Sequence, residues 1–148
     1  MFSSIMVGTD GSSTAAAAVG EAITLAGRVG ARLLIVSAYE PVSELRLREE
    51  RRSAPSDAQW MVSPREDVLA VLERSLKLAR EGGVADVETF ARQGDAADAI
   101  IDIAEEQGCD LIVVGNRGMT GARRFLLGSV PNRVSHHAPC SVLIVRTS

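Results

Sequence analysis

Residues 5–12 read Ile-Met-Val-Gly-Thr-Asp-Gly-Ser, and they lead directly into the alanine-rich stretch Ser-Thr-Ala-Ala-Ala-Ala-Val at residues 13–19. The apolar run at the start does not alternate with polar residues, which is typical of a strand buried on both faces of a parallel sheet. Residues 12–29 have helical periodicity, and Gly30 is well placed to end that helix. Five residues of the helix are expected to face the core: Ala16, Val19, Gly20, Ile23 and Ala26. A strand that passes through a glycine loop into a helix is the basic unit of an α/β fold.

The same unit recurs along the rest of the chain. Four more apolar runs are predicted to be strands: residues 33–36, 87–91, 111–114 and 142–145. Between them, a capping box at residues 63–66 opens one helix, Asp95 opens a second that Gly108 ends, and residues 129–137 form a third. The first of these has apolar residues at core spacing: Val68, Leu69, Leu72, Leu76 and Ala79. We therefore predict a single domain over residues 1–148, an α/β fold with an open five-stranded parallel sheet and helices on both faces.

Composition and charge limit the classes of partner. The chain has 148 residues, 16 Lys plus Arg against 19 Asp plus Glu and a net charge of −3, which does not favour nucleic acid or an acidic membrane. No apolar run approaches the ~20 residues of a membrane span, and residues 1–8 lack a signal-peptide pattern. We therefore expect a cytoplasmic protein that binds neither nucleic acid nor a membrane. Cys109 and Cys140 are expected to be reduced thiols, with a redox pair as the alternative.

One segment, residues 40–62, interrupts the alternation of strands and helices. It contains a run rich in arginine and glutamate at residues 44–52, then a stretch rich in Ser, Pro and Asp, and then Trp60. Two interpretations remain open for this variable insertion. It is a solvated loop, or it is a lid or partner-binding surface against which Trp60 is buried.

Two glycine-containing loops follow the first and fourth predicted strands. Gly8-Thr9-Asp10-Gly11 leaves the first strand, and Gly115-Asn116-Arg117-Gly118 leaves the fourth, with Gly128-Ser129-Val130 at a later helix start. Ligands of open α/β sheets bind at the carboxyl ends of the strands, and a helix N-terminus offers unpaired N–H groups and about half a positive charge. The spacing therefore predicts a cradle for an anion, with phosphate as the natural candidate. The alternative is that the glycines only mark turns and that Ser129 only caps a helix.

The same loops exclude several common phosphate-binding classes. A Walker-type NTPase needs the motif GxxxxGK[ST], which is absent, and the only lysine, Lys77, is expected in mid-helix away from both loops. The first loop is not GxGxxG, which argues against a Rossmann dinucleotide site. A receiver-type phosphoacceptor needs an acidic cluster after the first strand, where only Asp10 is present. The remaining candidate is a phosphate site built mainly from main-chain N–H groups.

These motifs resemble the universal stress protein family, in its ATP-binding branch. The resemblance is carried by Gly115-x2-Gly118-x9-Gly128-Ser129, by the opening Val7-Gly-Thr-Asp-Gly-Ser12 and by the closing Ala138-Pro-Cys-Ser-Val-Leu-Ile-Val145, and it covers essentially the whole chain. It implies a Rossmann-like sheet of the adenine nucleotide alpha hydrolase type with strand order 3-2-1-4-5. It also implies a homodimer, and an adenine nucleotide that is held with little or no hydrolysis.

The resemblance also assigns residues to the nucleotide. Five residues would hold its ribose and phosphates: Gly115, Gly118, Gly128, Ser129 and Val130. Thr9 and Asp10 would face the nucleotide, with Asp10 on the ribose or on a phosphate-bound Mg²⁺ or Mn²⁺. Main-chain groups of Ser37 or Ala38 would meet the adenine edge. Three arginines between the glycines are either phosphate ligands or solvated surface charges: Arg117, Arg123 and Arg124.

The sequence leaves three hypotheses for function. The leading one is an ATP-binding regulator or sensor of the stress response. The alternatives are a slow ATPase or phosphotransferase, and a cyclic AMP-binding protein of the same fold. We expect little or no turnover, because no convincing base for phosphoryl transfer stands near the glycine loops.

The last predicted strand bears on assembly. In the order 3-2-1-4-5 it is an edge strand, yet it contains no Pro, Lys or inward charge that would discourage pairing. We therefore predict a homodimer in which this strand pairs with its symmetry mate. The strand residues in question are Val142, Leu143, Ile144 and Val145.

Overall fold

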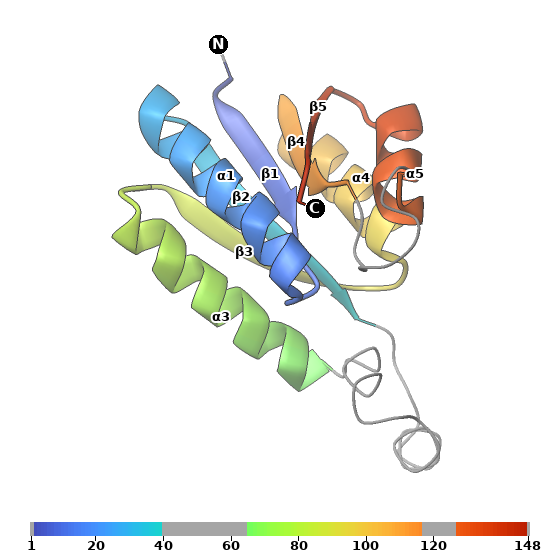
Figure 1. The fold of residues 1–148 in the computed structure, drawn as a ribbon, viewed down its shortest axis with the longest axis horizontal. Coiled ribbons are helices and arrows are strands. Elements are labelled where there is room, and N and C mark those ends of the chain that lie inside the picture. The colour runs from blue at the N-terminus through green and yellow to red at the C-terminus, as the bar shows by residue number, and fades with distance from the viewer. Residues whose placement is uncertain (1, 40–64, 117–126, 148) are drawn as a thin grey trace.

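Five parallel strands form one sheet in the computed structural model, which describes residues 2–39, 65–116 and 127–147. The strands are β1 (Ser4–Gly8), β2 (Arg32–Tyr39), β3 (Val87–Gln93), β4 (Leu111–Gly115) and β5 (Ser141–Val145). Their order across the sheet is β3-β2-β1-β4-β5 (Figure 1). The predicted Rossmann-like α/β fold and the predicted strand order are therefore confirmed.

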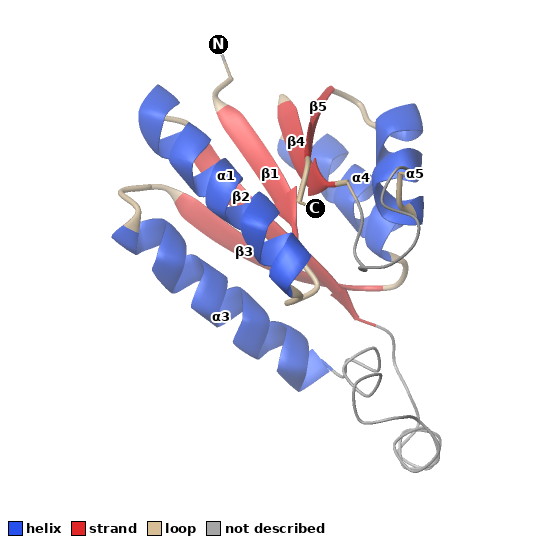
Figure 2. Cartoon of the chain, in the orientation of Figure 1, coloured by secondary structure: helices blue, strands red, loops and turns tan. Residues whose placement is uncertain are grey.

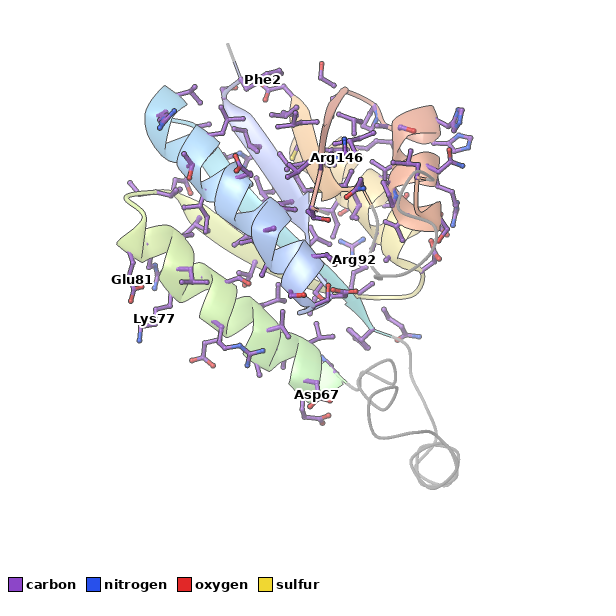
Figure 3. All side chains as sticks on the ribbon, in the orientation of Figure 1. Phe2, Asp67, Lys77, Glu81, Arg92 and Arg146 are labelled. Atoms are coloured by element: carbon purple, nitrogen blue, oxygen red, sulfur yellow. The ribbon has the colours of Figure 1, made fainter. Side chains whose placement is uncertain are left out.

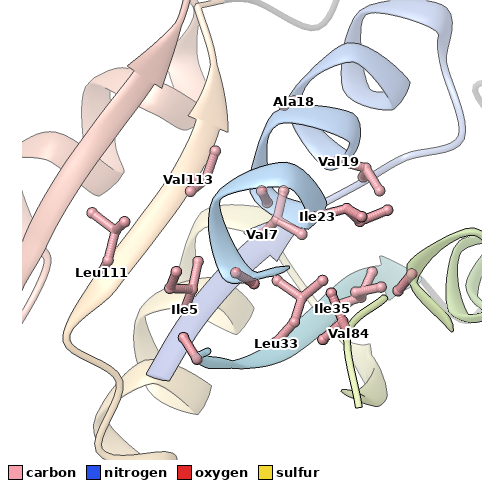
Figure 4. Close-up of a cluster of buried hydrophobic side chains, with 14 of the residues drawn as sticks. Ile5, Val7, Ala18, Val19, Ile23, Leu33, Ile35, Val84, Leu111 and Val113 are labelled. Carbon is pink, nitrogen blue, oxygen red and sulfur yellow. The ribbon is translucent and has the colours of Figure 1, made fainter. Parts of the chain in front are cut away.

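Helices cover both faces of the sheet (Figure 2). α1 (Ser13–Val29) and α3 (Arg65–Glu81) pack on one face, and α4 (Ala96–Gln107) and α5 (Ser129–His137) pack on the other. Strand side chains alternate between the two layers because a strand is pleated. Ile5 and Val7 point toward α1, as Figure 4 shows, whereas Met6 belongs to the opposite layer. Within the described ranges, none of the helices is both long enough and apolar enough to cross a membrane.

The helix ends follow the sequence signals. Ser12 is the N-cap of α1, where its Oγ accepts a hydrogen bond from the Ala15 N–H at 3.2 Å, so the helix itself begins one residue later than predicted. Asp95 caps α4 in the same way. Gly30 and Gly108 end these two helices with φ of +70° and +65°, the left-handed conformation that residues with a Cβ rarely adopt.

The inner face of α1 differs from the prediction. Ala18 and Ala22 are buried, whereas Ala16 and Gly20, which were expected in the core, are exposed. In an alanine-rich helix the residues on either side of the few larger side chains are nearly identical in size and polarity. Periodicity therefore shows that α1 is amphipathic, but it does not determine which of these small residues face the sheet.

The inner face of α3 is narrower than predicted. Its buried residues lie along one line of the helix: Val68, Leu72, Ser75 and Ala79. Leu69 was expected in the core but is 41% exposed, because it lies about 100° around the helix from Val68. Ser75 is tolerated inside because its Oγ–H donates to the Val71 carbonyl at 3.0 Å.

Polar contacts fix the amino-terminal edge of the sheet. The Asp110 carboxylate accepts hydrogen bonds from the Ser3 N–H at 2.9 Å and the Ser4 N–H at 3.0 Å. These bonds, the one from Ser3 foremost, lower the pKa of Asp110.

Cys109 and Cys140 are both free thiols, and burial raises the pKa of each. A raised pKa keeps the reactive thiolate scarce near neutral pH, which agrees with the prediction of reduced thiols.

Two exposed glycines of the α1 region form a matched pair for a stability test. An added Cβ meets no atom within 4 Å at either Gly20 or Gly30. Gly20 lies inside the helix, so Gly20→Ala is expected to raise the free energy of unfolding by about 0.5–1 kcal/mol. Gly30→Ala is expected to lower it by about 1–2 kcal/mol, because the left-handed conformation is costly for alanine. Urea denaturation measures both changes, and changes of the same sign would contradict this account.

Candidate functional site

The carboxyl ends of β1 and β4 lie side by side at one edge of the sheet. The two strands pair in parallel, with Val7 opposite Val113, and they end at Gly8 and Gly115. From β1 the chain continues outward to β2 and β3 on one side, whereas β4 and β5 lie on the other side of β1, so the strand order reverses between β1 and β4. Ligands of open α/β sheets bind at such a reversal of strand order. The two glycine loops singled out by the sequence therefore meet where a ligand is expected.

The loop after β1 is held by hydrogen bonds of its own. The Thr9 N–H donates to the Val36 carbonyl at 2.9 Å, and the Thr9 Oγ1 accepts from the Gly11 N–H at 3.1 Å. The Asp10 Oδ1 accepts from the Ser12 N–H at 2.9 Å. Together with the Ser12 cap on Ala15, these bonds engage the N–H groups of Thr9, Gly11 and Ser12 within the chain. This loop therefore presents an exposed carboxylate, Asp10, rather than a set of donors for an anion.

Gly11 brings this loop close to α3. It has φ of +84°, and an added Cβ would lie 2.8 Å from Cγ2 of Val71. Both the backbone conformation and the close approach therefore require glycine here. The position of the Asp10 carboxylate is set by this turn.

Asn116, the first residue after β4, makes main-chain hydrogen bonds to two other segments. The Asn116 N–H donates to the Val145 carbonyl at 2.9 Å, and the Asn116 carbonyl accepts from the Gly128 N–H at 2.8 Å. These two bonds join the end of β4 to β5 and to the start of α5. Gly115, Gly128, Ser129 and Val130 are thus brought to one place, as predicted.

The Asn116 side chain adds a contact that the sequence did not indicate. Its Oδ1 accepts hydrogen bonds from the Thr147 N–H at 3.0 Å and from the Thr147 hydroxyl at 2.9 Å. The segment after β5 is therefore fastened beside the same edge. An asparagine between the two glycines of the motif is the only sequence signal for this role, and Thr147 carries none.

The start of α5 is built differently from the starts of α1 and α4. Gly128 is its N-cap, with φ of −62° and ψ of 164°, and it makes no side-chain capping bond. The Asn132 N–H donates to the Gly128 carbonyl at 3.0 Å, and Pro131 has no N–H. Helix geometry leaves the N–H groups of Ser129 and Val130 without an acceptor inside the helix. These two N–H groups, with the positive end of the helix dipole, form an anion-binding terminus.

The end of β2 approaches the same edge from the other side. Ser37 is 3% exposed, and Ala38 packs against the layer formed by α4 and α5. The side chains of Ser37 and Ala38 point to opposite faces of the sheet because the strand is pleated. A ligand at this edge would therefore meet the main-chain groups of the segment rather than both side chains. The Tyr39 carbonyl is already used, since it accepts the Gly94 N–H at 2.8 Å.

Several predicted residues lie outside the described ranges. They are Arg117, Gly118, Arg123, Arg124 and the insertion at residues 40–62 with Trp60. Lys77 is exposed on α3 (Figure 3), as expected for a lysine without a phosphate role. In the part of the chain that is described, no three His, Cys, Asp or Glu residues come together as a metal site. Asp10 alone would bind Mg²⁺ only together with the oxygens of a ligand and water.

Comparison with known proteins connects this geometry to a family. The model of the universal stress protein family matches residues 1–146 of the chain. The universal stress protein Rv1636 of Mycobacterium tuberculosis is 36% identical over 149 residues, covering 99% of this chain and 98% of that protein. The universal stress protein YxiE of Bacillus subtilis is 34% identical over 158 residues, covering 99% of this chain and all of that protein.

Solved structures give the same result at the level of the fold. A crystal structure of a universal stress protein in complex with cAMP matches with a TM-score of 0.76 and 34% identity, covering 99% of each chain. UspA from Lactobacillus plantarum matches with a TM-score of 0.76 and 25% identity, covering 98% of each chain.

Proposed function

This chain belongs to the universal stress protein family, and we propose that it binds an adenine nucleotide, ATP first, at the carboxyl edge of its sheet. The observation that carries this proposal is the start of α5, where Gly128 provides no side-chain cap for the helix. In α1 and α4, by contrast, the N-cap residue has a polar side chain, and that side chain accepts one N–H of the first turn. A phosphate on the N–H groups of Ser129 and Val130 would complete the α5 terminus.

The rest of the edge offers complementary groups for such a nucleotide. The Ser129 hydroxyl adds a donor beside the two N–H groups. The exposed Asp10 carboxylate suits a ribose hydroxyl or a Mg²⁺ or Mn²⁺ ion held by the phosphates. Main-chain groups at Ser37 and Ala38 suit the polar edge of adenine. These assignments agree with the family pattern of Gly115, Gly118, Gly128 and Ser129, and they explain how a chain without a Walker lysine would bind a polyanion.

Hydrolysis is expected to be slow or absent. Phosphoryl transfer requires a group that orients the attacking nucleophile, in addition to charge neutralisation. In the loop after β1 the Asp10 Oδ1 is engaged by the Ser12 N–H at 2.9 Å, which suits a fixed binding role better than proton transfer. We therefore propose a regulator or sensor whose nucleotide state controls its contacts. Its cytoplasmic location stays a prediction.

Cyclic AMP is a second candidate ligand. A universal stress protein that is 34% identical to this chain was solved in complex with cAMP. Two N–H groups at the start of α5 match the two free oxygens of a cyclic phosphate, whereas a triphosphate needs further partners. Residues 117–126 contain three arginines that would serve a triphosphate: Arg117, Arg123 and Arg124.

Calorimetric titration of the ligand-free full-length protein tests the proposal. We expect ATP to bind with micromolar or better affinity in the presence of Mg²⁺, and native mass spectrometry of freshly purified protein to show a bound adenine nucleotide. Competition between ATP and cAMP then ranks the two candidates. Failure of both nucleotides to bind a protein with a cooperative unfolding transition would refute the proposal.

We also propose that the protein is a homodimer through β5. Leu143 and Ile144 are 41% and 38% exposed although they lie in a strand on opposite sides of the sheet. A lone chain would leave this apolar edge uncovered. Pairing of β5 with its twofold mate would bury both side chains and extend the sheet across the dimer.

A further inference from the structure

Few side chains of α5 are buried, so its position depends on a small number of contacts. α5 has nine residues, of which only Pro131 and Val134 are buried. It lies beside α4 on the outer side of the sheet (Figure 1). Binding through main-chain N–H groups requires that the helix be held within a fraction of an ångström of its productive position. Val130 also packs in part on the core, and the Gly128 N–H is bonded to the Asn116 carbonyl, so the start of α5 is held at one end. A contact further along the helix would fix its orientation.

Arg133 provides that contact on the α4 side. One guanidinium nitrogen, Nη1, donates to the Asp95 Oδ2 at 2.7 Å, and the other, Nη2, donates to the Asp98 Oδ1 at 2.5 Å. Asp95 is the N-cap of α4, and its Oδ2 also accepts the Asp98 N–H at 3.1 Å. A single side chain of α5 therefore bridges the N-cap of α4 and the acidic residue of its first turn. The planar fork of arginine suits this double contact, which the single ammonium of lysine cannot reproduce.

The same contact also affects the charge beside the phosphate site. α4 and α5 both begin on the loop side of the sheet, after β3 and after the β4 loop. Two uncompensated carboxylates there would repel an anion at the start of α5. Arg133 neutralises them in part, although the side chains are 46%, 49% and 57% exposed for Arg133, Asp95 and Asp98. At such exposure the ion pairs contribute little to global stability, so an effect of Arg133 is expected in the local order of α5 rather than in the stability of the whole domain.

We propose that Arg133 is a positioning residue for the nucleotide site: it fastens α5 to the first turn of α4 and so holds the Ser129 and Val130 N–H groups in place for phosphate. This inference rests on the proposed function for its effect on binding. The part of the inference that concerns structure, that Arg133 holds α5 against α4, does not depend on the proposed function. We call the contact of Arg133 with Asp95 and Asp98 the clamp. None of its three residues belongs to the glycine pattern, so the motif does not contain it.

Three conservative variants separate positioning from simple electrostatics. Arg133→Gln breaks the clamp and removes a positive charge, whereas Asp98→Asn weakens the clamp and removes a negative charge. If only the electric field mattered, the two variants would change nucleotide affinity in opposite directions. If positioning matters, both lower it. Glu106→Gln is the matched control, because it removes the same charge as Asp98→Asn and breaks an exposed ion pair of α4 with Arg92, at 2.9 and 3.1 Å, away from α5.

The experiment measures ATP and cAMP affinity by calorimetry and amide hydrogen exchange in α5 of the ligand-free protein. We expect Arg133→Gln to lower affinity about 5- to 10-fold and Asp98→Asn to lower it about 3- to 5-fold, the range of one or two exposed ion pairs. Both variants should speed exchange in α5, while Glu106→Gln changes neither quantity. Arg133→Lys should fall between Arg133→Gln and the wild type.

The outcomes are distinguishable from failure of the proposed function. Higher affinity in Asp98→Asn, or α5 exchange equal to that of the wild type in Arg133→Gln, would overturn the inference. A wild-type protein that binds neither nucleotide refutes the proposed function, and α5 exchange then still decides whether Arg133 fastens the helix. All four variants are expected to unfold within about 2 °C of the wild type, because the pairs are exposed.

Discussion

Gly128→Asp is expected to lower nucleotide affinity at least about 100-fold while it raises the stability of the ligand-free protein. Aspartate is a preferred N-cap residue, and Gly128 has the extended conformation that an N-cap needs, with φ of −62° and ψ of 164°. The new carboxylate would accept the Val130 N–H and favour the positive end of the α5 dipole. These contacts are expected to add about 0.5–1 kcal/mol to the free energy of unfolding.

The same carboxylate would take the place of the phosphate. It would accept the Val130 N–H, so the phosphate would lose a charge-assisted hydrogen bond worth about 1.5–3 kcal/mol. Its negative charge would also repel the phosphate by about 1–4 kcal/mol at 4 Å. A loss of about 2.8 kcal/mol already corresponds to 100-fold in affinity. Stability and binding therefore change in opposite directions, which a general disruption of the fold cannot produce.

Gly128→Asn is the control for charge. Asparagine caps the helix nearly as well but remains neutral, so its affinity is expected to lie between those of the wild type and Gly128→Asp. Calorimetric titration and thermal unfolding of the three proteins give both quantities. A more stable Gly128→Asp protein with unchanged nucleotide affinity would show that the phosphate does not lie at the start of α5.

Much of the fold was predictable because its signals are local. Unbroken apolar runs mark the central strands, and Ser12, Gly30, Asp95 and Gly108 mark helix ends through side-chain caps and left-handed glycines. The rotation of α1 was not predictable, because alanines dominate both of its flanks. Packing on the sheet determines which alanines are buried: Ala18 and Ala22 belong to the same buried cluster as the strand residues Ile5 and Val7.

The candidate site was predictable only where glycines and strand ends mark it. The placement of Gly115 and Gly128 follows from parallel strands that share a carboxyl edge. The contact of Asn116 with Thr147 joins residues 31 positions apart, and that of Arg133 with Asp95 joins residues 38 positions apart. Such contacts are set by how α5 and the segment after β5 pack in three dimensions. The sequence marked Asp95 as a helix start, but it showed Arg133 and Thr147 only as ordinary polar side chains.

Ile144→Pro is expected to convert the homodimer into a monomer. The Val145 carbonyl accepts the Asn116 N–H, so the main-chain groups of Val145 face β4. Main-chain direction alternates along a strand, so the groups of Leu143 also face β4 while those of Val142 and Ile144 face the open edge. Proline at position 144 removes an edge donor without removing a bond of the β4–β5 ladder. It is tolerated at such an edge position in isolated sheets.

Twofold symmetry makes the effect of this substitution large. Each change occurs in both copies of β5, so two edge hydrogen bonds and two apolar side chains are lost for one substitution. Each bond contributes about 0.5–1.5 kcal/mol. Ile144 is 38% exposed, so burying the rest of each isoleucine contributes about 0.6–1.1 kcal/mol. The expected weakening of the dimer is therefore on the order of 100-fold or more, since each tenfold step requires about 1.4 kcal/mol. Ile144→Val retains the donor and most of the apolar surface and should remain a dimer.

Light scattering at micromolar concentration distinguishes a mass of 15.7 kDa from twice that value. Nucleotide titration of Ile144→Pro provides the check on folding, because Val145 and Thr147 hold Asn116 beside the start of α5. A monomer that retains nucleotide affinity shows that the substitution acted on the open edge alone. A dimeric Ile144→Pro protein, or a monomeric wild type, would exclude β5 as the dimer interface, and the exposed Leu143 and Ile144 would then require a different covering surface.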